Sequence, residues 1–134
     1  MQFPDNLKYT SEHEWVRLED PKSDGKVALV GITDFAQSEL GELVYVEVDT
    51  IGQHLEKDKI FGTVEAVKTT SELFMPVSGK ILEFNPALDE NDGDNPGLIN
   101  EDPYGEGWIV KIELDNTNDL NELFNAKAYE EMIS

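Results

Sequence analysis

The chain has 134 residues, no cysteine, and 29 acidic against 10 basic residues, which gives a formal net charge of −19. This length suits one domain, residues 1–134, with a core of its own, and a chain without cysteine has no disulfide framework and no thiol. So acidic a surface repels nucleic-acid phosphates and anionic lipids, so neither is expected as a partner. The acidity either favours association with proteins that have basic patches or serves only to keep the protein soluble.

The chain contains no apolar run long enough to cross a membrane. The first residues, Met1 to Asp5, have neither the regions of a signal peptide nor the Arg- and Ser-rich composition of a transit peptide. We therefore expect a cytoplasmic protein, or a protein of the mitochondrial matrix if a transit peptide has been removed.

The first half of the chain alternates turn residues with short runs of branched residues, as β-strands do. Strands are predicted at 15–18, 26–32 and 43–48, with a turn at 21–25 between the first two. Alternation in the third strand predicts that Val44, Val46 and Val48 share one face.

A short helix is predicted between the second and third strands. Thr33 is a suitable N-cap, Asp34 is favourable in the first turn, and Gly41 ends the helix. Its inward-facing side chains are expected to be Phe35, Ala36 and Leu40.

Residues 62–79 are predicted to form two strands with Lys68 at the bend between them. Alternation turns Gly62, Val64 and Ala66 to one side of the first strand, and Leu73, Met75 and Val77 to one side of the second. Pro76 places the second strand at a sheet edge or at a bend. Taken alone, Lys68 is an ordinary solvated turn residue.

The second half continues with strands at 80–85 and 108–114, separated by a long connection. Its acidic part, 89–95, lacks the closing glutamate and flanking helices of a calcium-binding EF-hand, so a solvated loop is expected. The segment 97–108 is expected to be irregular. Two short helical pieces at about 119–133 are predicted to cover one side of the sheets with two apolar stripes, formed by Leu120, Leu123 and Phe124 and by Tyr129, Met132 and Ile133.

His13 is the residue that most invites a metal site. Arg17 stands where a zinc-binding HExxH helix needs its second histidine, and His54 is far away in the sequence. We therefore expect no metal and a strand-edge histidine within a hydrogen-bond network. Short strands with frequent turns and little helix predict an all-β sandwich or barrel.

Several separate motifs then occur in an order that resembles the H proteins of the glycine cleavage system. They are His-Glu-Trp at 13–15, Gly-Ile-Thr-Asp-Phe-Ala-Gln at 31–37, Glu-Ala-Val-Lys at 65–68, Pro-Val-Ser-Gly at 76–79 and the Pro- and Gly-rich segment 97–108. The match spans about Tyr9 to Ile133. Ala66 stands where the family usually has serine, and the connection between Leu88 and Pro96 is longer than usual. The resemblance implies a mainly β barrel-sandwich hybrid of two antiparallel sheets, with a lipoyl-lysine hairpin and short flanking helices.

The resemblance also implies a function, that of a carrier protein and not an enzyme in its own right. Lys68 would carry lipoate in amide linkage. The lipoyl arm would receive an aminomethyl group from the pyridoxal-phosphate-dependent glycine decarboxylase (P protein) and deliver it to the tetrahydrofolate-dependent aminomethyltransferase (T protein). Dihydrolipoamide dehydrogenase (L protein) would reoxidise the arm, a lipoylating enzyme would attach it, and the carrier is expected to be a monomer.

By motif position, the resemblance assigns roles to three further carboxylates. Glu14 and Glu72 would line a surface on which the loaded arm docks, and Glu65 would help the lipoylating enzyme to recognise the hairpin. Glu39 occupies a position where some family members have histidine. Each of these residues is otherwise an ordinary surface carboxylate.

Other carriers fit the chain less well. Biotin carriers have methionine on both sides of their lysine, where this chain has Val67 and Thr69, and lipoyl domains of 2-oxoacid dehydrogenases usually have aspartate before the lysine. Two alternatives remain open: an H-like lipoyl protein for lipoate relay or sulfur metabolism, and an unmodified acidic interaction domain whose Lys68 stays free.

Overall fold

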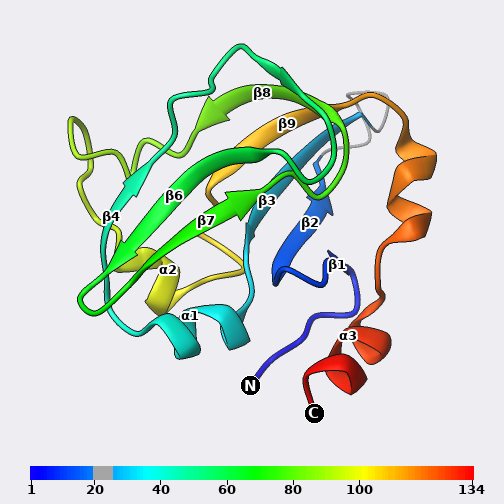
Figure 1. The fold of residues 1–134 in the computed structure, drawn as a ribbon, viewed down its shortest axis with the longest axis horizontal. Helices are drawn as coiled ribbons and strands as arrows, with labels where there is room; N and C mark the ends of the chain where they lie inside the picture. Colours follow the sequence, from blue (N-terminus) through cyan, green and yellow to red (C-terminus); the bar gives the residue numbers. More distant parts are fainter. Residues whose placement is uncertain (20–25) are drawn as a thin grey trace.

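Short strands in two antiparallel sheets form the framework of the structure, a computed structural model that describes residues 1–19 and 26–134 (Figure 1). The six-stranded sheet has the order β1 (Lys8–Tyr9), β2 (Glu14–Leu18), β3 (Val27–Ile32), β9 (Val110–Leu114), β8 (Gly79–Phe84) and β5 (His54–Leu55). The three-stranded sheet has the order β4 (Leu43–Glu47), β6 (Ile60–Ala66) and β7 (Thr70–Phe74). The turn predicted at 21–25 lies outside the described residues.

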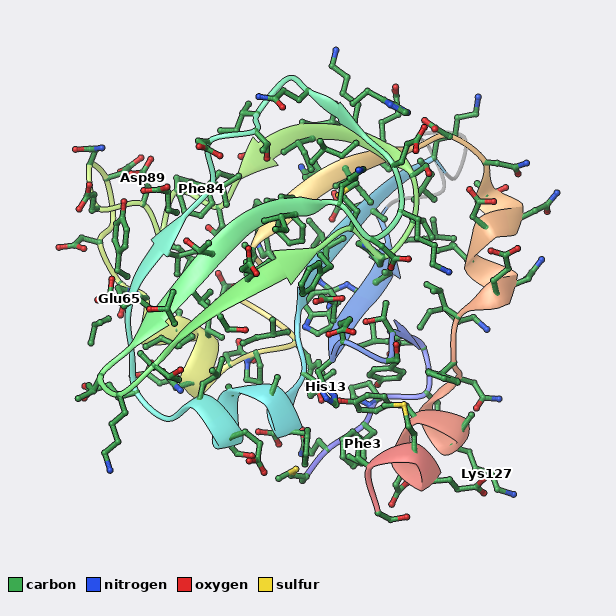
Figure 2. All side chains as sticks on the ribbon, in the orientation of Figure 1. Phe3, His13, Glu65, Phe84, Asp89 and Lys127 are labelled. Atoms are coloured by element: carbon green, nitrogen blue, oxygen red, sulfur yellow. The ribbon has the colours of Figure 1, made fainter. Side chains whose placement is uncertain are left out.

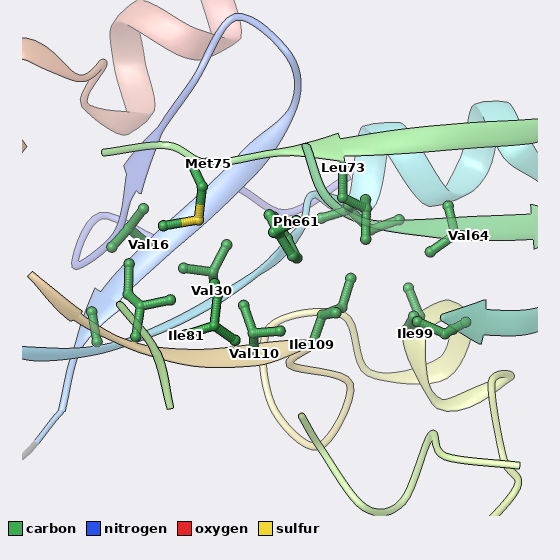
Figure 3. Close-up of a cluster of buried hydrophobic side chains, with 14 of the residues drawn as sticks. Val16, Val30, Phe61, Val64, Leu73, Met75, Ile81, Ile99, Ile109 and Val110 are labelled. Carbon is green, nitrogen blue, oxygen red and sulfur yellow. The ribbon is translucent and has the colours of Figure 1, made fainter. Parts of the chain in front are cut away.

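The two sheets lie face to face, and the core fills the space between them (Figures 1 and 3). Val30, Ile81 and Val110 contribute from the larger sheet, and Val64 and Leu73 from the smaller one. Within the described residues no strand pairing joins the two sheets, so they form a sandwich and not a closed barrel. The prediction of a mainly β fold with two antiparallel sheets is confirmed.

The hairpin of β6 and β7, which contains Lys68, is built as its alternation predicts. Gly62, Val64 and Ala66 are buried on β6, and Leu73 is buried on β7. β7 is one of the two edge strands of the smaller sheet and ends at Phe74, just before the predicted bend at Pro76.

The alternation predicted for β4, the strand that pairs with β6, is wrong at Val44. The pairing of β4 with β6 steps from Leu43↔Ala66 to Tyr45↔Glu65, so β4 has one extra residue at this point. Such a bulge interrupts the alternation of side chains along a strand. Val44 consequently lies 46% exposed, while Leu43 and Val46 are buried.

Helix α1 (Asp34–Leu40) begins and ends at the predicted residues. The Thr33 side chain accepts a hydrogen bond from the backbone N–H of Ala36, and Gly41 ends the helix with a φ of 80°. Ala36 and Leu40 pack against the core as expected, although no residue of α1 is fully buried.

The segment expected to be irregular contains a one-turn helix, α2 (Leu98–Glu101), so that expectation is wrong for these four residues. A four-residue helix is too short to show a helical period in the sequence. Ile99 anchors α2 in the core. Asn100 accepts a hydrogen bond from the Leu43 N–H and donates one to the Gly41 carbonyl, so α2 fixes the start of β4.

The chain closes with a 3₁₀ helix (Thr117–Glu122) and helix α3 (Ala126–Ile133). With Leu7, Trp15 and Leu29, α3 buries Tyr129 in a second cluster of apolar side chains against the larger sheet. The predicted stripe is wrong at Met132, which is 39% exposed. At 100° per residue, Met132 lies about 90° from the centre of the face formed by Ala126, Tyr129 and Ile133.

Within residues 1–19 and 26–134, none of the helices combines the length and the apolar character needed to cross a bilayer.

Candidate functional site

The turn of the β6–β7 hairpin lies at the edge of the molecule (Figure 1). Lys68, in this turn, is exposed to solvent. The Ala66 N–H donates a 2.7 Å hydrogen bond to the Thr69 carbonyl, and the Val67 N–H donates a 3.2 Å hydrogen bond to the Glu42 carbonyl. These bonds close the turn and tie it to the start of β4. Among the described residues, no carboxylate forms an ion pair with Lys68. A primary amine in this position is accessible for acylation.

Beside the hairpin lies a pocket of about 360 Å³. Its lining comes from the corner that precedes β2, from α1 and from both arms of the hairpin. Apolar side chains form much of its lining: Ile32, Phe35, Ala36, Leu40, Val64 and Leu73. Four glutamates also line it: Glu12, Glu14, Glu39 and Glu72. An apolar cavity with convergent acids suits a ligand that has an aliphatic body and a cationic end.

Glu14 is the unusual acid of this set because only 2% of its surface is exposed. Its carboxyl group accepts hydrogen bonds from the Thr10 hydroxyl at 2.7 Å and from the Phe74 N–H at 3.4 Å. Burial raises the pKa of Glu14 to about 8, against the opposing effect of these two hydrogen bonds. Glu14 is therefore largely protonated at neutral pH, and a cation bound nearby would favour its ionisation.

His13 lies in the same lining, next to α1 (Figure 2). Its Nδ1 is 2.8 Å from the Tyr129 hydroxyl, and its ring lies 5.0 Å from that of Phe35. The expected hydrogen-bond network is confirmed. Desolvation lowers the pKa of His13, although the nearby Glu12 and Glu39 oppose this effect. In the part of the chain that the structure describes, no group of three or more His, Asp or Glu side chains could hold a metal ion.

The structure brings together some of the residues that the resemblance singled out. Glu14 and Glu72 line the pocket with Glu39, and Glu14 is buried there and is not the surface carboxylate of the simpler interpretation. Glu65 is exposed on β6, in register with Thr70 on the other arm of the hairpin, and lies outside the pocket lining (Figure 2).

Sequence reasoning did not assign Glu12 to the lining or Tyr129 to the hydrogen bond with His13. Tyr129 is 116 positions from His13 in the sequence, and no local pattern links them. Glu12 adjoins the His-Glu-Trp motif, but its polarity alone does not distinguish it from other surface acids.

Comparisons with known proteins agree with this geometry. The family model described as glycine cleavage H-protein matches residues 7–134. The glycine cleavage system H protein of Bacteroides fragilis is 52% identical over 134 residues, which cover 100% of this chain and 99% of that protein. The H protein of Chlorobium limicola is 53% identical over 133 residues, which cover 99% and 98%.

The fold is similar to a solved structure of the same family. The crystal structure of a glycine cleavage system H protein from Mycobacterium marinum superposes with a TM-score of 0.83 at 34% identity, covering 97% of this chain and 98% of that one. The family model and both relatives span essentially the whole chain. The chain belongs to the glycine cleavage H-protein family.

Proposed function

We propose that this protein is the lipoyl-carrying shuttle of glycine cleavage and that Lys68 is its attachment residue. One observation carries the proposal: an exposed lysine lies at the turn of a hairpin whose two arms help to form an acid-lined apolar pocket. The shared name of the relatives favours glycine cleavage over lipoate relay or sulfur metabolism.

Lys68 would hold lipoate through an amide bond, which removes the positive charge of the lysine. When bound, the group supplies a dithiolane that accepts and releases the aminomethyl group. The hairpin turn places the attachment point away from the body of the protein, so the arm can enter the active site of a docked enzyme. A tether of this kind raises the local concentration of its end group at that site.

The pocket would receive the loaded arm between visits to partner enzymes. Its lining of Ile32, Val64 and Leu73 suits an aliphatic chain and excludes water. Glu72 offers an exposed carboxylate for the cationic amine, and Glu14 can lose its proton in response to that charge. The pocket thereby protects a cargo that water would destroy.

The same proposal names the partners and the setting. The shuttle would visit glycine decarboxylase, the aminomethyltransferase and dihydrolipoamide dehydrogenase, and it would carry out no catalysis itself. Its acidic surface suits enzymes with basic patches around their active sites. We further propose a monomeric, single-domain protein of the bacterial cytoplasm; the relatives named above are bacterial and lend no support to the mitochondrial alternative.

Lipoylation in vitro tests the attachment site. The purified protein is incubated with a lipoylating enzyme, lipoate and ATP, and the intact mass and the modified peptide are measured. Lys68→Arg should remove the adduct completely, whereas Lys80→Arg, at another exposed lysine, should leave it unchanged. Glu65→Gln should slow the lipoylation of Lys68 but should not shift the adduct to another residue. An adduct that survives Lys68→Arg, or a wild-type protein that stays unmodified, would contradict the proposal.

A further inference from the structure

We propose that Tyr129, on the C-terminal helix, is a positioning residue for the docking pocket, because its hydroxyl group holds two walls of that pocket in place at once. One wall is His13, and the other is helix α1. This inference rests on the proposed function, in which the pocket receives the loaded arm.

Two hydrogen bonds of equal length meet at the Tyr129 hydroxyl. It lies 2.8 Å from Nδ1 of His13 and 2.8 Å from Oγ1 of Thr33. Thr33 in turn caps α1 by accepting a 3.1 Å hydrogen bond from the Ala36 N–H. Tyr129 itself is completely buried, and its ring stacks on Tyr9 with centroids 4.8 Å apart. The hydroxyl therefore has a fixed position from which it reaches both walls.

The hydrogens in this network can be assigned from what each group has available. Thr33 is fully buried and already accepts the Ala36 N–H, so its own hydrogen needs an acceptor. The Tyr129 oxygen is the acceptor that lies within reach. Tyr129 then donates its hydrogen to Nδ1 of His13. Only this direction uses every hydrogen, and it leaves His13 as the neutral tautomer with its proton on Nε2.

The backbone of His13 shows why such support is needed. His13 has a φ of 71°, in the left-handed region that a residue other than glycine occupies at a cost. The Thr33 N–H donates a 3.0 Å hydrogen bond to the His13 carbonyl, so the backbones of these two residues are joined as well. The Tyr129 hydroxyl group joins the side chains of His13 and Thr33 in addition.

A neutral His13 matters for the charge of the pocket. The titratable groups around it are Glu12 on its own loop, Glu39 on α1, Glu72 on β7 and the buried Glu14 next to it in the chain. A protonated histidine there would offset the acids that a cationic cargo requires. Burial lowers the pKa of His13 and raises that of Tyr129, so Tyr129 keeps the proton that it donates.

The first test compares two variants that each lose one buried hydroxyl from the same pair of stacked rings. Tyr129→Phe removes the bond to His13, whereas Tyr9→Phe removes a 2.7 Å bond to the Pro4 carbonyl. Nitrogen-15 spectra of the His13 ring are recorded on the unloaded protein. The wild type and Tyr9→Phe should show the fixed Nε2–H tautomer, and Tyr129→Phe should show a mixture of tautomers and a higher pKa. Identical spectra in both variants, or a mixture already in the wild type, would overturn the inference.

The second test measures how long the loaded arm survives in water when no partner enzyme is present. Tyr129→Phe should shorten its lifetime about fivefold relative to Tyr9→Phe, a factor typical of one lost hydrogen bond. Equal lifetimes in the two variants, with a protected wild type, would refute the positioning role and leave docking intact. If the wild-type arm is not protected at all, docking fails, and the spectra of the unloaded protein still decide the role of Tyr129.

Discussion

The hydroxyl group of Thr10 donates a 2.7 Å hydrogen bond to Oε1 of Glu14, which lines the pocket beside the β6–β7 hairpin. This bond does not compensate for the burial of the carboxyl group, whose pKa remains raised to about 8. Glu14 therefore couples the charge of the pocket to the stability of the fold.

The first prediction concerns the pH dependence of that stability. Between the ordinary carboxyl pKa of 4.5 and about 8, the folded protein holds the Glu14 proton and the unfolded chain releases it. The free energy of unfolding should therefore fall as the pH rises through this window, by up to about 1.4 kcal/mol per pH unit from this group. Denaturant unfolding at a series of pH values measures the slope.

Glu14→Gln provides the control, because the repulsion among the other acids stays in both proteins. The two stability curves should nearly coincide below pH 4.5 and separate above it, with the variant more stable at pH 8. Curves that stay parallel from pH 4.5 to 8 would show that Glu14 ionises normally in the folded protein.

The bulge in β4 gives a second prediction, on two valines only two positions apart. Val44 is 46% exposed and Val46 is 2% exposed. Val44→Thr should change the unfolding free energy by less than about 0.5 kcal/mol, because its hydroxyl group stays in water. Val46→Thr should cost about 1–3 kcal/mol, because it buries a hydroxyl group in the apolar core. Thermal or denaturant unfolding of both variants measures the difference; equal losses would mean that β4 pairs with β6 without a bulge.

Close approach of β4 to β6 gives a third prediction. A Cβ atom at Gly62 would lie 2.5 Å from the Glu47 carbonyl oxygen and 3.0 Å from Cγ2 of Val48. Gly62→Ala should therefore force the two strands apart and destabilise the protein by about 1–3 kcal/mol. Gly97→Ala is the matched control, because the nearest atom there is 3.5 Å away and the backbone is helical. If both variants unfold at the same denaturant concentration, the strand contact is looser than described.

Local patterns in the sequence predicted much of the fold because local chemistry determines those parts. The alternation of Gly62, Val64 and Ala66 survives in β6, and Thr33 and Gly41 bound α1 as their side-chain and backbone chemistry requires. The turn that presents Lys68 also follows from the two strands on either side of it.

The errors arise where distant segments determine the outcome. The bulge at Val44 depends on pairing with β6, and α2 depends on the anchoring of Ile99 in the core and on the bonds of Asn100 to β4. The outward position of Met132 depends on which face of α3 meets the sheet. In none of these three cases is the segment that determines the outcome adjacent in the sequence.

The same distinction applies to the candidate site. The motif around Lys68 is contiguous and could be recognised by resemblance, and so could the positions of Glu14 and Glu72. The burial of Glu14 could not be predicted, and neither could the roles of Thr33 and Tyr129 in the hydrogen-bond network of His13, because segments 60 or more positions apart create them. These are also the features that determine the charge of the pocket.

The most direct measurement of the central claim is the intact mass of the lipoylated protein after incubation with glycine and the pyridoxal-phosphate-dependent decarboxylase. The account predicts a second mass increase on the peptide that contains Lys68, equal to an aminomethyl group on one sulfur of the opened dithiolane plus a hydrogen on the other. The aminomethyl group should be lost when the aminomethyltransferase and tetrahydrofolate are added. A lipoylated Lys68 that gains no mass from glycine, with a decarboxylase shown to load another H protein, would contradict the shuttle function.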